Sequence, residues 1–485
     1  MLYHSTRNLM PQVDSAQAVL NGLASDGGLY MPENIPAFDW QECLKGDTKA
    51  MATMILSTLL PDIPNMEQLV HDAYTGKFAT EELTPTVPVG DFTILELFHG
   101  PTSAFKDVAL CMLPQLMTAA KSAKGMGEDI LILTATSGDT GKAALEGFKD
   151  VPGVGICVFY PDGGVSAVQR AQMVTQEGNN VTVSAVRGNF DDAQTGVKNI
   201  FNACADGKLL EGKSFRLSSA NSINIGRLAP QVTYYFKAYR DLLDRGTIQL
   251  GDEVNFCVPT GNFGDILAGY LAKLLGLPVG MLLCASNTNK VLDDFIHTGT
   301  YDRNRPLHKT TSPSMDILVS SNLERLLYLL SGDTELVASL MHDLNTKGSY
   351  QVPEALLEKI QAQFWGFHCG DDQTCVNIGE CWENHGYLLD PHTATAWAAA
   401  NSYTQQTGDN RPMVILSTAS PYKFPAAVLE AIGGDMSGDE FQQMERLQEL
   451  TGVRIPANLA GLQGKAERHT GVINKEDMQD FVLSI

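Results

Sequence analysis

The sequence predicts an α/β protein in which parallel sheets are covered by helices on both faces. From about residue 92 onward, short apolar runs rich in β-branched residues recur, and stretches long enough for amphipathic helices separate them. Strands and helices that alternate in this way form parallel sheets. The runs fall into two groups, before and after about residue 226, and 485 residues are too many for one hydrophobic core. We therefore expect two α/β halves with a cleft between them.

The elements follow from local patterns. Residues 1–91 contain apolar helical stretches between Gly/Pro turns, so we expect a mainly helical N-terminal domain, followed by a catalytic region over 92–430. A Gly-Gly break then opens a C-terminal extension over 431–485, for which the sequence indicates no chemistry. The stretch 370–384 is polar and is predicted to be a loop. The expected strands are Ile130–Ala135, Val154–Tyr160, Val181–Val186, Glu253–Val258, Val279–Ala285 and Met413–Ser417, and the expected helices include Ala50–Leu60, Pro353–Phe364 and Asp439–Leu450.

Charge and composition exclude several classes of protein. A net charge of −22 argues against coating nucleic acid or an anionic membrane surface. Neither a secretory signal nor an apolar run long enough to span a membrane is recognisable, and the scattered, odd number of cysteines is untypical of a disulfide framework, so we expect a cytoplasmic protein. No metal is predicted, because one clustered set lacks the paired spacing of zinc sites: His368, Cys369, Cys375, Cys381 and His385.

The first motif that carries chemistry is HGPTSAFKD, residues 99–107. A Gly-Pro turn leads to Lys106 and then to an apolar helix, so the lysine is expected near a helix start, where the dipole disfavours a protonated amine. An amine of lowered pKa is what covalent chemistry with an aldehyde needs. A single lysine in such a motif is more often a solvated surface residue, so this motif decides nothing alone.

Three further motifs supply donors for anions. TATSGDTG (134–141) and PTGNFGD (259–265) each follow an apolar run and precede a helix, and their backbone N–H groups suit a phosphate or carboxylate. Each is alternatively an ordinary helix start, and Asp265 is expected to cap its helix. NSINIGR (221–227) gathers amides, a hydroxyl and Arg227, or is simply a polar turn. The PTGNFGD loop matches neither a Walker A loop nor a dinucleotide-binding fingerprint, so ATP and dinucleotides are disfavoured as ligands.

Taken together, these motifs resemble the threonine synthase family, enzymes of the tryptophan-synthase-β-like fold type II that use pyridoxal 5'-phosphate. The likeness begins with YHSTR (3–7) and LASDGGLY (23–30), runs through the four motifs above and PSMDI (313–317), and ends with STASPYKFP (417–425). It thus covers most of the chain. The joint order and spacing of the motifs carry it, since no single motif is specific.

The resemblance implies a role for individual residues. Lys106 matches the lysine that forms a Schiff base with the cofactor and acts as the catalytic base. Thr418 matches the hydroxyl beside the pyridine nitrogen, a partner that suits elimination and replacement better than transamination. Asp139 matches the residue near the ring hydroxyl. The loop that binds the cofactor phosphate corresponds to Gly261, Asn262, Phe263, Gly264 and Asp265, and the substrate-binding residues correspond to Thr136, Ser137, Thr140, Asn221, Ser222 and Arg227.

Two positions depart from the pattern. Asp139 stands where many enzymes of this fold type have asparagine, and a carboxylate there changes the protons available to the cofactor. Ser420 stands where many members have histidine, so we assign it no role.

The resemblance implies that O-phospho-L-homoserine loses phosphate, gains water and becomes L-threonine, and that the enzyme is a monomer or a homodimer. Three alternatives remain: a phospholyase that releases 2-oxobutyrate, a serine or threonine dehydratase, and a non-catalytic protein that only binds the cofactor. The substrate of a serine or threonine dehydratase carries no phosphate for Arg227 to bind. The product formed from phosphohomoserine distinguishes a threonine synthase from a phospholyase and from a non-catalytic protein.

Overall fold

The computed structural model describes residues 1–136, 138–204, 210 and 213–485. Its N-terminal part is not purely helical. An antiparallel sheet in the order β2-β1-β3 joins β1 (Leu2–Ser5), β2 (Asn8–Asp14) and β3 (Tyr30–Pro32). Four helices accompany this sheet: α1 (Ser15–Asn21), α2 (Trp40–Cys43), α3 (Thr48–Leu59) and α4 (Met66–Tyr74).

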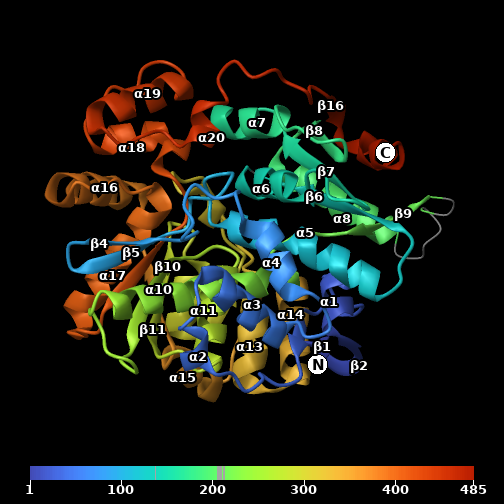
Figure 1. Cartoon of the computed structure of the whole chain (residues 1–485), viewed down its shortest axis with the longest axis horizontal. Helices are drawn as coiled ribbons and strands as arrows, with labels where there is room; N and C mark the ends of the chain where they lie inside the picture. Colours follow the sequence, from blue (N-terminus) through green and yellow to red (C-terminus); the bar gives the residue numbers. More distant parts are fainter. Residues whose placement is uncertain (137, 205–209, 211–212) are drawn as a thin grey trace.

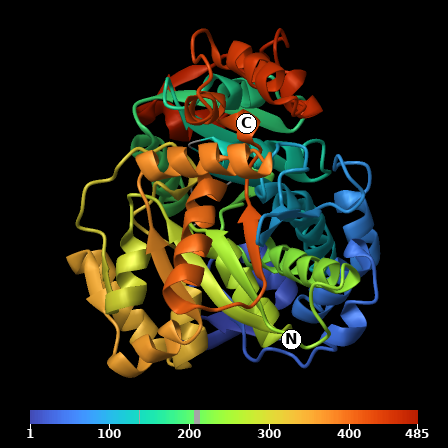
Figure 2. The same cartoon turned by 90° about the vertical axis from the view of Figure 1, so that its left-hand side faces the viewer.

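A six-stranded sheet forms one half of the molecule (Figure 1, Figure 2). Its order is β14-β11-β10-β15-β5-β4, and every neighbouring pair is parallel except β4 with β5. The strands are β4 (Thr86–Val89), β5 (Phe92–Glu96), β10 (Val254–Pro259), β11 (Val279–Ser286), β14 (Phe364–His368) and β15 (Met413–Ser417).

A five-stranded parallel sheet forms the other half, in the order β16-β8-β7-β6-β9. Its strands are β6 (Asp129–Ala135), β7 (Val154–Pro161), β8 (Val181–Arg187), β9 (Phe215–Ser218) and β16 (Val472–Asn474). All six strands predicted from apolar runs are present across the two sheets. The division at about residue 226 is too simple, because β5 precedes it but pairs with β15, and β16 returns from the C-terminal end.

Helices pack on both sheets and bury continuous apolar clusters against them. Helix α17 contacts β10, β11 and β15, and α8 contacts β6 and β7. Two short strands, β12 (Thr300–Asp302) and β13 (Ser349–Gln351), pair apart from the sheets. The later helices are α5 (Lys106–Ala123), α6 (Asp139–Phe148), α7 (Ala167–Val174), α8 (Phe190–Ala203), α9 (Ile225–Leu228), α10 (Val232–Asp244), α11 (Gly264–Leu274), α12 (Val291–Thr298), α13 (Leu323–Ser331), α14 (Thr334–Lys347), α15 (Glu354–Gln361), α16 (Asp371–His385), α17 (Pro391–Thr407), α18 (Pro425–Ala431), α19 (Glu440–Thr451), α20 (Ala457–Ala460) and α21 (Met478–Leu483).

Three sequence expectations differ from the structure. The stretch 370–384 is helix α16, not a loop: its buried residues Thr374, Asn377, Ile378 and Cys381 recur at helical spacing, but two of them are polar and hide the apolar stripe. The predicted boundary at residue 91 falls in the β4–β5 turn, so it divides strands of one sheet. We expected the helix Pro353–Phe364 to continue through Phe364, but α15 ends at Gln361 and β14 begins at Phe364.

The C-terminal segment crosses from one half to the other. In Figure 1 it runs in red from α18 and α19 along α7 to β16 and the C-terminus. Strand β16 extends the five-stranded sheet, and Met478 and Val482 of α21 are buried against α8 in its core. Glu440 of α19 accepts hydrogen bonds from the backbone N–H groups of Ala167 and Val168 at the start of α7.

The strand ends explain where the motifs meet. HGPTSAFKD, TATSGDTG, NSINIGR, PTGNFGD and STASPYKFP follow the carboxyl ends of β5, β6, β9, β10 and β15 respectively, and all five strands belong to parallel pairs. Ligands of open α/β sheets bind at this edge. Within the described residues, no helix is both long and apolar enough to span a membrane.

Candidate active site

Lys106 is the first residue of α5 and is only 8% exposed. The preceding segment is fixed by pairing with the end of β15: Phe105 donates its N–H to the carbonyl of Thr418 at 2.8 Å, and Ser420 donates its N–H to the carbonyl of Ser103 at 3.1 Å. An isolated β-bridge joins Ala104 and Ala419 between these bonds. Two motifs that lie more than 300 residues apart in the sequence therefore form one wall of the site.

The surroundings of Lys106 make its amine easier to deprotonate than that of an exposed lysine. Burial lowers the pKa of Lys106 to about 8, repulsion from Arg227 and Lys423 lowers it as well, and attraction to Asp139 and Asp107 opposes them. The predicted lowering of the pKa is thus present, but burial is its main cause rather than the helix dipole. The Nζ atom of Lys106 lies 4.0 Å from Oδ2 of Asp139.

Asp139 is a buried carboxylate with two strong donors. Lys423 Nζ lies 2.6 Å from its Oδ1 atom, and Gln169 Nε2 donates to the same oxygen at 3.0 Å. Burial raises the pKa of Asp139, but the Lys423 and Lys106 cations outweigh burial and hold the pKa well below its usual range. Asp139 is therefore ionised.

The TATSGDTG loop is stabilised from within. The Thr136 hydroxyl accepts the N–H groups of Gly138 at 3.0 Å and Gly141 at 2.9 Å, and it donates to the Gly138 carbonyl at 3.1 Å. We predicted that Thr136 binds substrate, but its hydroxyl is engaged in shaping the loop. Thr140 is half-buried in the first turn of α6, and Ser137 lies outside the described residues.

The PTGNFGD loop turns sharply into α11. Phe263 has a φ of 62°, a left-handed conformation, and Gly261 lies so close to the carbonyl of Ser314 that an added Cβ would be 2.6 Å from its oxygen. Asp265 does not cap α11, which is a correction. Its Oδ1 atom instead accepts the hydroxyls of Tyr234 at 2.6 Å and Tyr235 at 3.1 Å, and burial raises its pKa to about 6.

Arg227 lies in α9 and is buried, with 5% of its surface exposed. Its Nη1 atom donates to the Ala220 carbonyl at 2.8 Å, and no carboxylate of the described residues forms an ion pair with it. Burial lowers its pKa to about 10, so the guanidinium is still charged near neutral pH. A buried cation without an acidic partner favours an anionic ligand. The neighbouring Asn221 is exposed and Ser222 is half-buried.

The residues that hold these loops together lie outside the motifs recognised in the sequence. Asn322 donates from Nδ2 to the carbonyls of Ser222 and Asn262, both at 3.1 Å, and so joins the two anion-binding loops. Arg325, fully buried in α13, donates to Asn322 at 2.5 Å and to the Ile223 carbonyl at 2.6 Å. The sequence feature that could have revealed Arg325 is the presence of an arginine within the apolar run LERLLYLL.

The YHSTR motif also has its place here. Thr6 donates to Glu324 at 2.6 Å, and Arg7 forms an ion pair with the same carboxylate at 2.8 Å, which ties β1 to α13. This motif is therefore joined to α13, the helix that carries Arg325.

A buried histidine supports the glycine loop from its other side. His392 Nδ1 lies 2.7 Å from Oδ2 of Asp390, and its Nε2 atom accepts the N–H of Ser314 at 3.1 Å. The proton is therefore on Nδ1 and the ring is oriented by the carboxylate. Since Ser314 packs on Gly261, this pair fixes the position of the loop. Thr418, the residue predicted beside the pyridine nitrogen, is 6% exposed.

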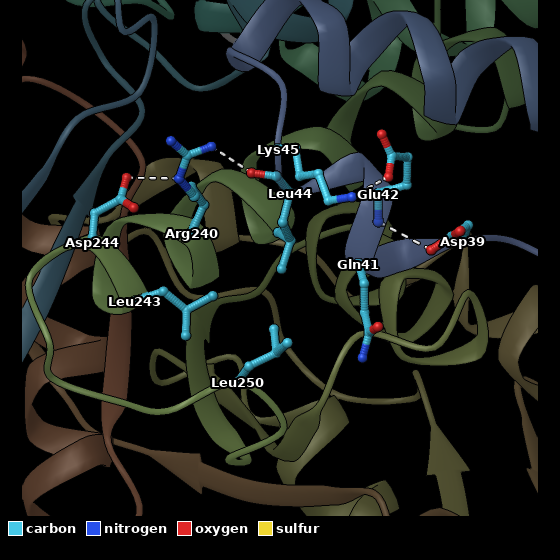
Figure 3. A pocket seen from close by; sticks show the side chains of 9 residues that line it. All are labelled: Asp39, Gln41, Glu42, Leu44, Lys45, Arg240, Leu243, Asp244 and Leu250. Carbon is cyan, nitrogen blue, oxygen red and sulfur yellow. Dashed lines mark hydrogen bonds and ion pairs between the residues drawn. The ribbon is translucent and has the colours of Figure 1, made fainter.

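A surface hollow of about 350 Å³ lies between α2 and α10, apart from these motifs. Figure 3 shows its lining. Four of its five charged side chains form ion pairs, Arg240 with Asp244 at 2.7 Å and Lys45 with Glu42, and the fifth, Asp39, accepts the backbone N–H of Glu42 at 3.0 Å. We assign no chemistry to it. Its lining consists of Asp39, Gln41, Glu42, Leu44, Lys45, Arg240, Leu243, Asp244 and Leu250.

Comparisons with known proteins agree with this geometry. The family model described as "Threonine synthase N terminus" matches residues 2–74, "Pyridoxal-phosphate dependent enzyme" matches 81–419, and "Threonine synthase, C-terminal" matches 393–482. Threonine synthase from Pseudomonas aeruginosa is 40% identical over 486 residues, covering 97% of this chain and 98% of that protein. The chain belongs to the threonine synthase family of pyridoxal-phosphate-dependent enzymes.

Two further relatives define its place in this family. Human threonine synthase-like 1 is 40% identical over 434 residues, which cover 86% of this chain and only 58% of that longer protein. The crystal structure of pyridoxal-phosphate-bound threonine synthase from Brucella melitensis superposes with a TM-score of 0.88 at 37% identity, covering 99% of this chain and 98% of that one. The family and fold class predicted from the sequence are confirmed.

The residues present fit pyridoxal phosphate. Helices α6 and α11 begin in the interior, and neither N-cap residue, Gly138 or Phe263, caps its helix with a side chain. At the start of α6 the Thr136 hydroxyl accepts the N–H of Gly141, and among the described residues no side chain accepts an N–H at the start of α11. Buried N–H groups need an acceptor, which a phosphate or carboxylate provides. Lys106 offers an amine of lowered pKa to the aldehyde. We predicted that Gly261 to Asp265 bind the phosphate through the backbone, and the uncapped start of α11 is consistent with that role.

Proposed function

We propose that this chain is a threonine synthase that converts O-phospho-L-homoserine and water to L-threonine and inorganic phosphate. The observation that carries this proposal is Arg227, which is buried, has no ion-paired carboxylate among the described residues, and repels the protonated amine of Lys106, so that it lowers the pKa of Lys106. A substrate that reacts at the lysine and carries a phosphate matches this pair. A dehydratase substrate would leave the buried arginine without an anion.

When bound, pyridoxal phosphate supplies an aldehyde that condenses with amines and a ring that accepts negative charge from the adjacent carbon. The chain supplies the other functions. The start of α11 would hold the cofactor phosphate, and Thr418 would lie beside the pyridine nitrogen. By the family pattern, Asp139 would lie near the ring hydroxyl.

Lys106 is proposed to move the protons of the reaction. As a neutral amine it takes a proton from Cα of the substrate and then one from Cβ, after which phosphate leaves Cγ. It later returns one proton to Cγ and one to Cα, while water adds its hydroxyl at Cβ and its remaining proton goes to the released phosphate. Arg227, with Asn221 and Ser222, binds the substrate phosphate before and after it leaves Cγ. Backbone N–H groups at the start of α6, with Thr140 and Ser137, bind the substrate carboxylate.

The test is to incubate the holoenzyme with O-phospho-L-homoserine and measure phosphate, threonine and 2-oxobutyrate together. Equal amounts of phosphate and threonine are expected, and Lys106→Ala should abolish both. Phosphate accompanied by 2-oxobutyrate instead of threonine would show a phospholyase. Cofactor binding without phosphate release would show a non-catalytic protein.

We further propose a cytoplasmic enzyme that acts as a monomer or homodimer. Cys43, Cys111, Cys157, Cys257 and Cys284 are buried free thiols, which is typical of proteins from a reducing compartment. Size-exclusion chromatography with light scattering measures the assembly state, and a trimer or larger species would contradict this proposal.

A further inference from the structure

Lys423 is a completely buried lysine, and the resemblance to the family implies no role for it. Its side chain has 0% exposure, its Nζ atom lies 2.6 Å from Asp139 Oδ1, and it donates to the Thr102 carbonyl at 3.1 Å. Asp139 belongs to the TATSGDTG loop and Thr102 to the loop before Lys106. The ammonium group of Lys423 therefore joins three segments of the site.

Asp139 is shared by two lysines at unequal distances. Lys423 lies in hydrogen-bond contact with Oδ1, whereas Lys106 Nζ lies 4.0 Å from Oδ2. Without Lys423, a buried carboxylate would have Lys106 as its nearest cation and would favour the protonated amine. The charged groups around Lys106 come from five segments: Asp139 on α6, Arg227 on α9, Asp265 on α11, Asp107 on α5 and Lys423 after β15.

We propose that Lys423 is a positioning residue whose ammonium group neutralises the carboxylate of Asp139. With this carboxylate neutralised, protonation of Lys106 is less favourable and its amine is free to react. This inference rests on the proposed function of the site. It also accounts for the carboxylate at position 139, where many enzymes of this fold type have a neutral amide. The acid is tolerated because a buried lysine accompanies it.

The test is a pH titration of the visible absorbance of the holoenzyme, which follows protonation of the linkage between Lys106 and the cofactor. In Lys423→Met the midpoint should rise by about one pH unit or more, since one repulsive cation is lost and Asp139 is no longer neutralised. Lys423→Arg keeps the charge and should restore most of the wild-type midpoint. An unchanged midpoint in folded Lys423→Met would overturn the inference.

Lys142→Met is the matched control. Lys142 is also buried and lies on the same helix as Asp139, but it bonds Glu146 at 3.0 Å and Gln176. Its loss should leave the titration midpoint unchanged. An equal rise in both variants would show that any buried lysine has this effect, which contradicts a specific role for Lys423.

A double variant separates charge balance from folding. Asp139→Asn alone leaves Lys423 unpaired beside Lys106 and should lower the midpoint. Asp139→Asn combined with Lys423→Met removes both charges and should return the midpoint close to the wild-type value. If the double variant keeps the full rise of Lys423→Met, the two charges do not compensate each other and the inference is wrong.

These outcomes are distinct from failure of the proposed function. A wild-type protein that binds no pyridoxal phosphate, or that releases no phosphate from phosphohomoserine, would remove the proposed function itself. If the wild-type enzyme makes threonine but Lys423→Met leaves the titration midpoint unchanged, only the role of Lys423 is ruled out.

Discussion

Arg325 Nη1 donates a hydrogen bond of 2.5 Å to the side-chain oxygen of Asn322, and both side chains are completely buried. Asn322 in turn binds the carbonyls of Ser222 and Asn262. The distance between the two anion-binding loops therefore depends on a pair of residues that belongs to neither. In the function we propose, one ligand presents an aldehyde to Lys106 and another places its phosphate near Arg227, so this pair of residues would set the distance between the two ligands.

Replacing Arg325 with methionine should loosen both loops together. Three carbonyl or amide acceptors lose their donor in the interior, so the free energy of unfolding should fall by about 3 kcal/mol. Cofactor affinity and substrate affinity should both decrease. Urea unfolding and cofactor titration measure these effects. Arg240→Met is the control, because Arg240 also bonds backbone carbonyls but lies away from both loops; equal loss of cofactor affinity there would contradict the prediction.

Much of the fold could be predicted because local runs of apolar residues mark its strands. The strands Ile130–Ala135 and Val279–Ala285 are continuous apolar runs, as expected for parallel strands buried on both faces. The pairing of β5 with β15 and of β16 with β8 could not be predicted, since each joins segments almost 300 residues or more apart. Helix α16 was missed because Thr374 and Asn377 occupy its buried face.

The candidate site was predictable only as far as its motifs. Lys106, Arg227 and Gly261 stand in recognisable loops, whereas Lys423 and Arg325 act on groups distant in sequence. Nothing in the local sequence shows that a lysine in SPYKF faces an aspartate in TSGDTG. Such pairs become visible only when parallel strands bring their carboxyl ends together.

Arg227 should determine the affinity for the phosphorylated substrate. Arg227→Met removes a buried, charge-assisted contact worth about 2–3 kcal/mol, so kcat/KM for phosphohomoserine should fall by roughly 30- to 150-fold. The dissociation constant of pyridoxal phosphate should change little. Arg216→Met is the control, because Arg216 lies on β9 nearby and donates instead to the Leu20 carbonyl. A greater loss of cofactor affinity than of kcat/KM would contradict the assigned role.

The pKa of Lys106 predicts a pH dependence for covalent cofactor attachment. Only the unprotonated amine attacks an aldehyde, and burial lowers the pKa of Lys106 to about 8. The rate of attachment to the apoenzyme should therefore rise about tenfold per pH unit below pH 8 and level off above it. Stopped-flow absorbance measures this rate. A rate that continues to rise to pH 10 would mean that the lysine is not desolvated.

Asn458 links the C-terminal segment to the loop before Lys106. Its Nδ2 atom donates to the Pro101 carbonyl at 2.7 Å, and its Oδ1 atom accepts the Ser103 hydroxyl at 3.0 Å. Ser103 has a φ of 59°, a conformation that needs such support. Asn458→Ala should lower kcat by about tenfold, a loss of about 1.4 kcal/mol. Asn401→Ala, which removes only a bond within α17, should leave kcat unchanged.

The most direct test of the account is to map the lysine that carries the cofactor. The holoenzyme is reduced with borohydride and digested, and the phosphopyridoxyl peptide is identified by mass spectrometry. The account predicts one equivalent of label on Lys106. Label on Lys423, Lys142 or any other lysine, with Lys106 unmodified, would contradict it.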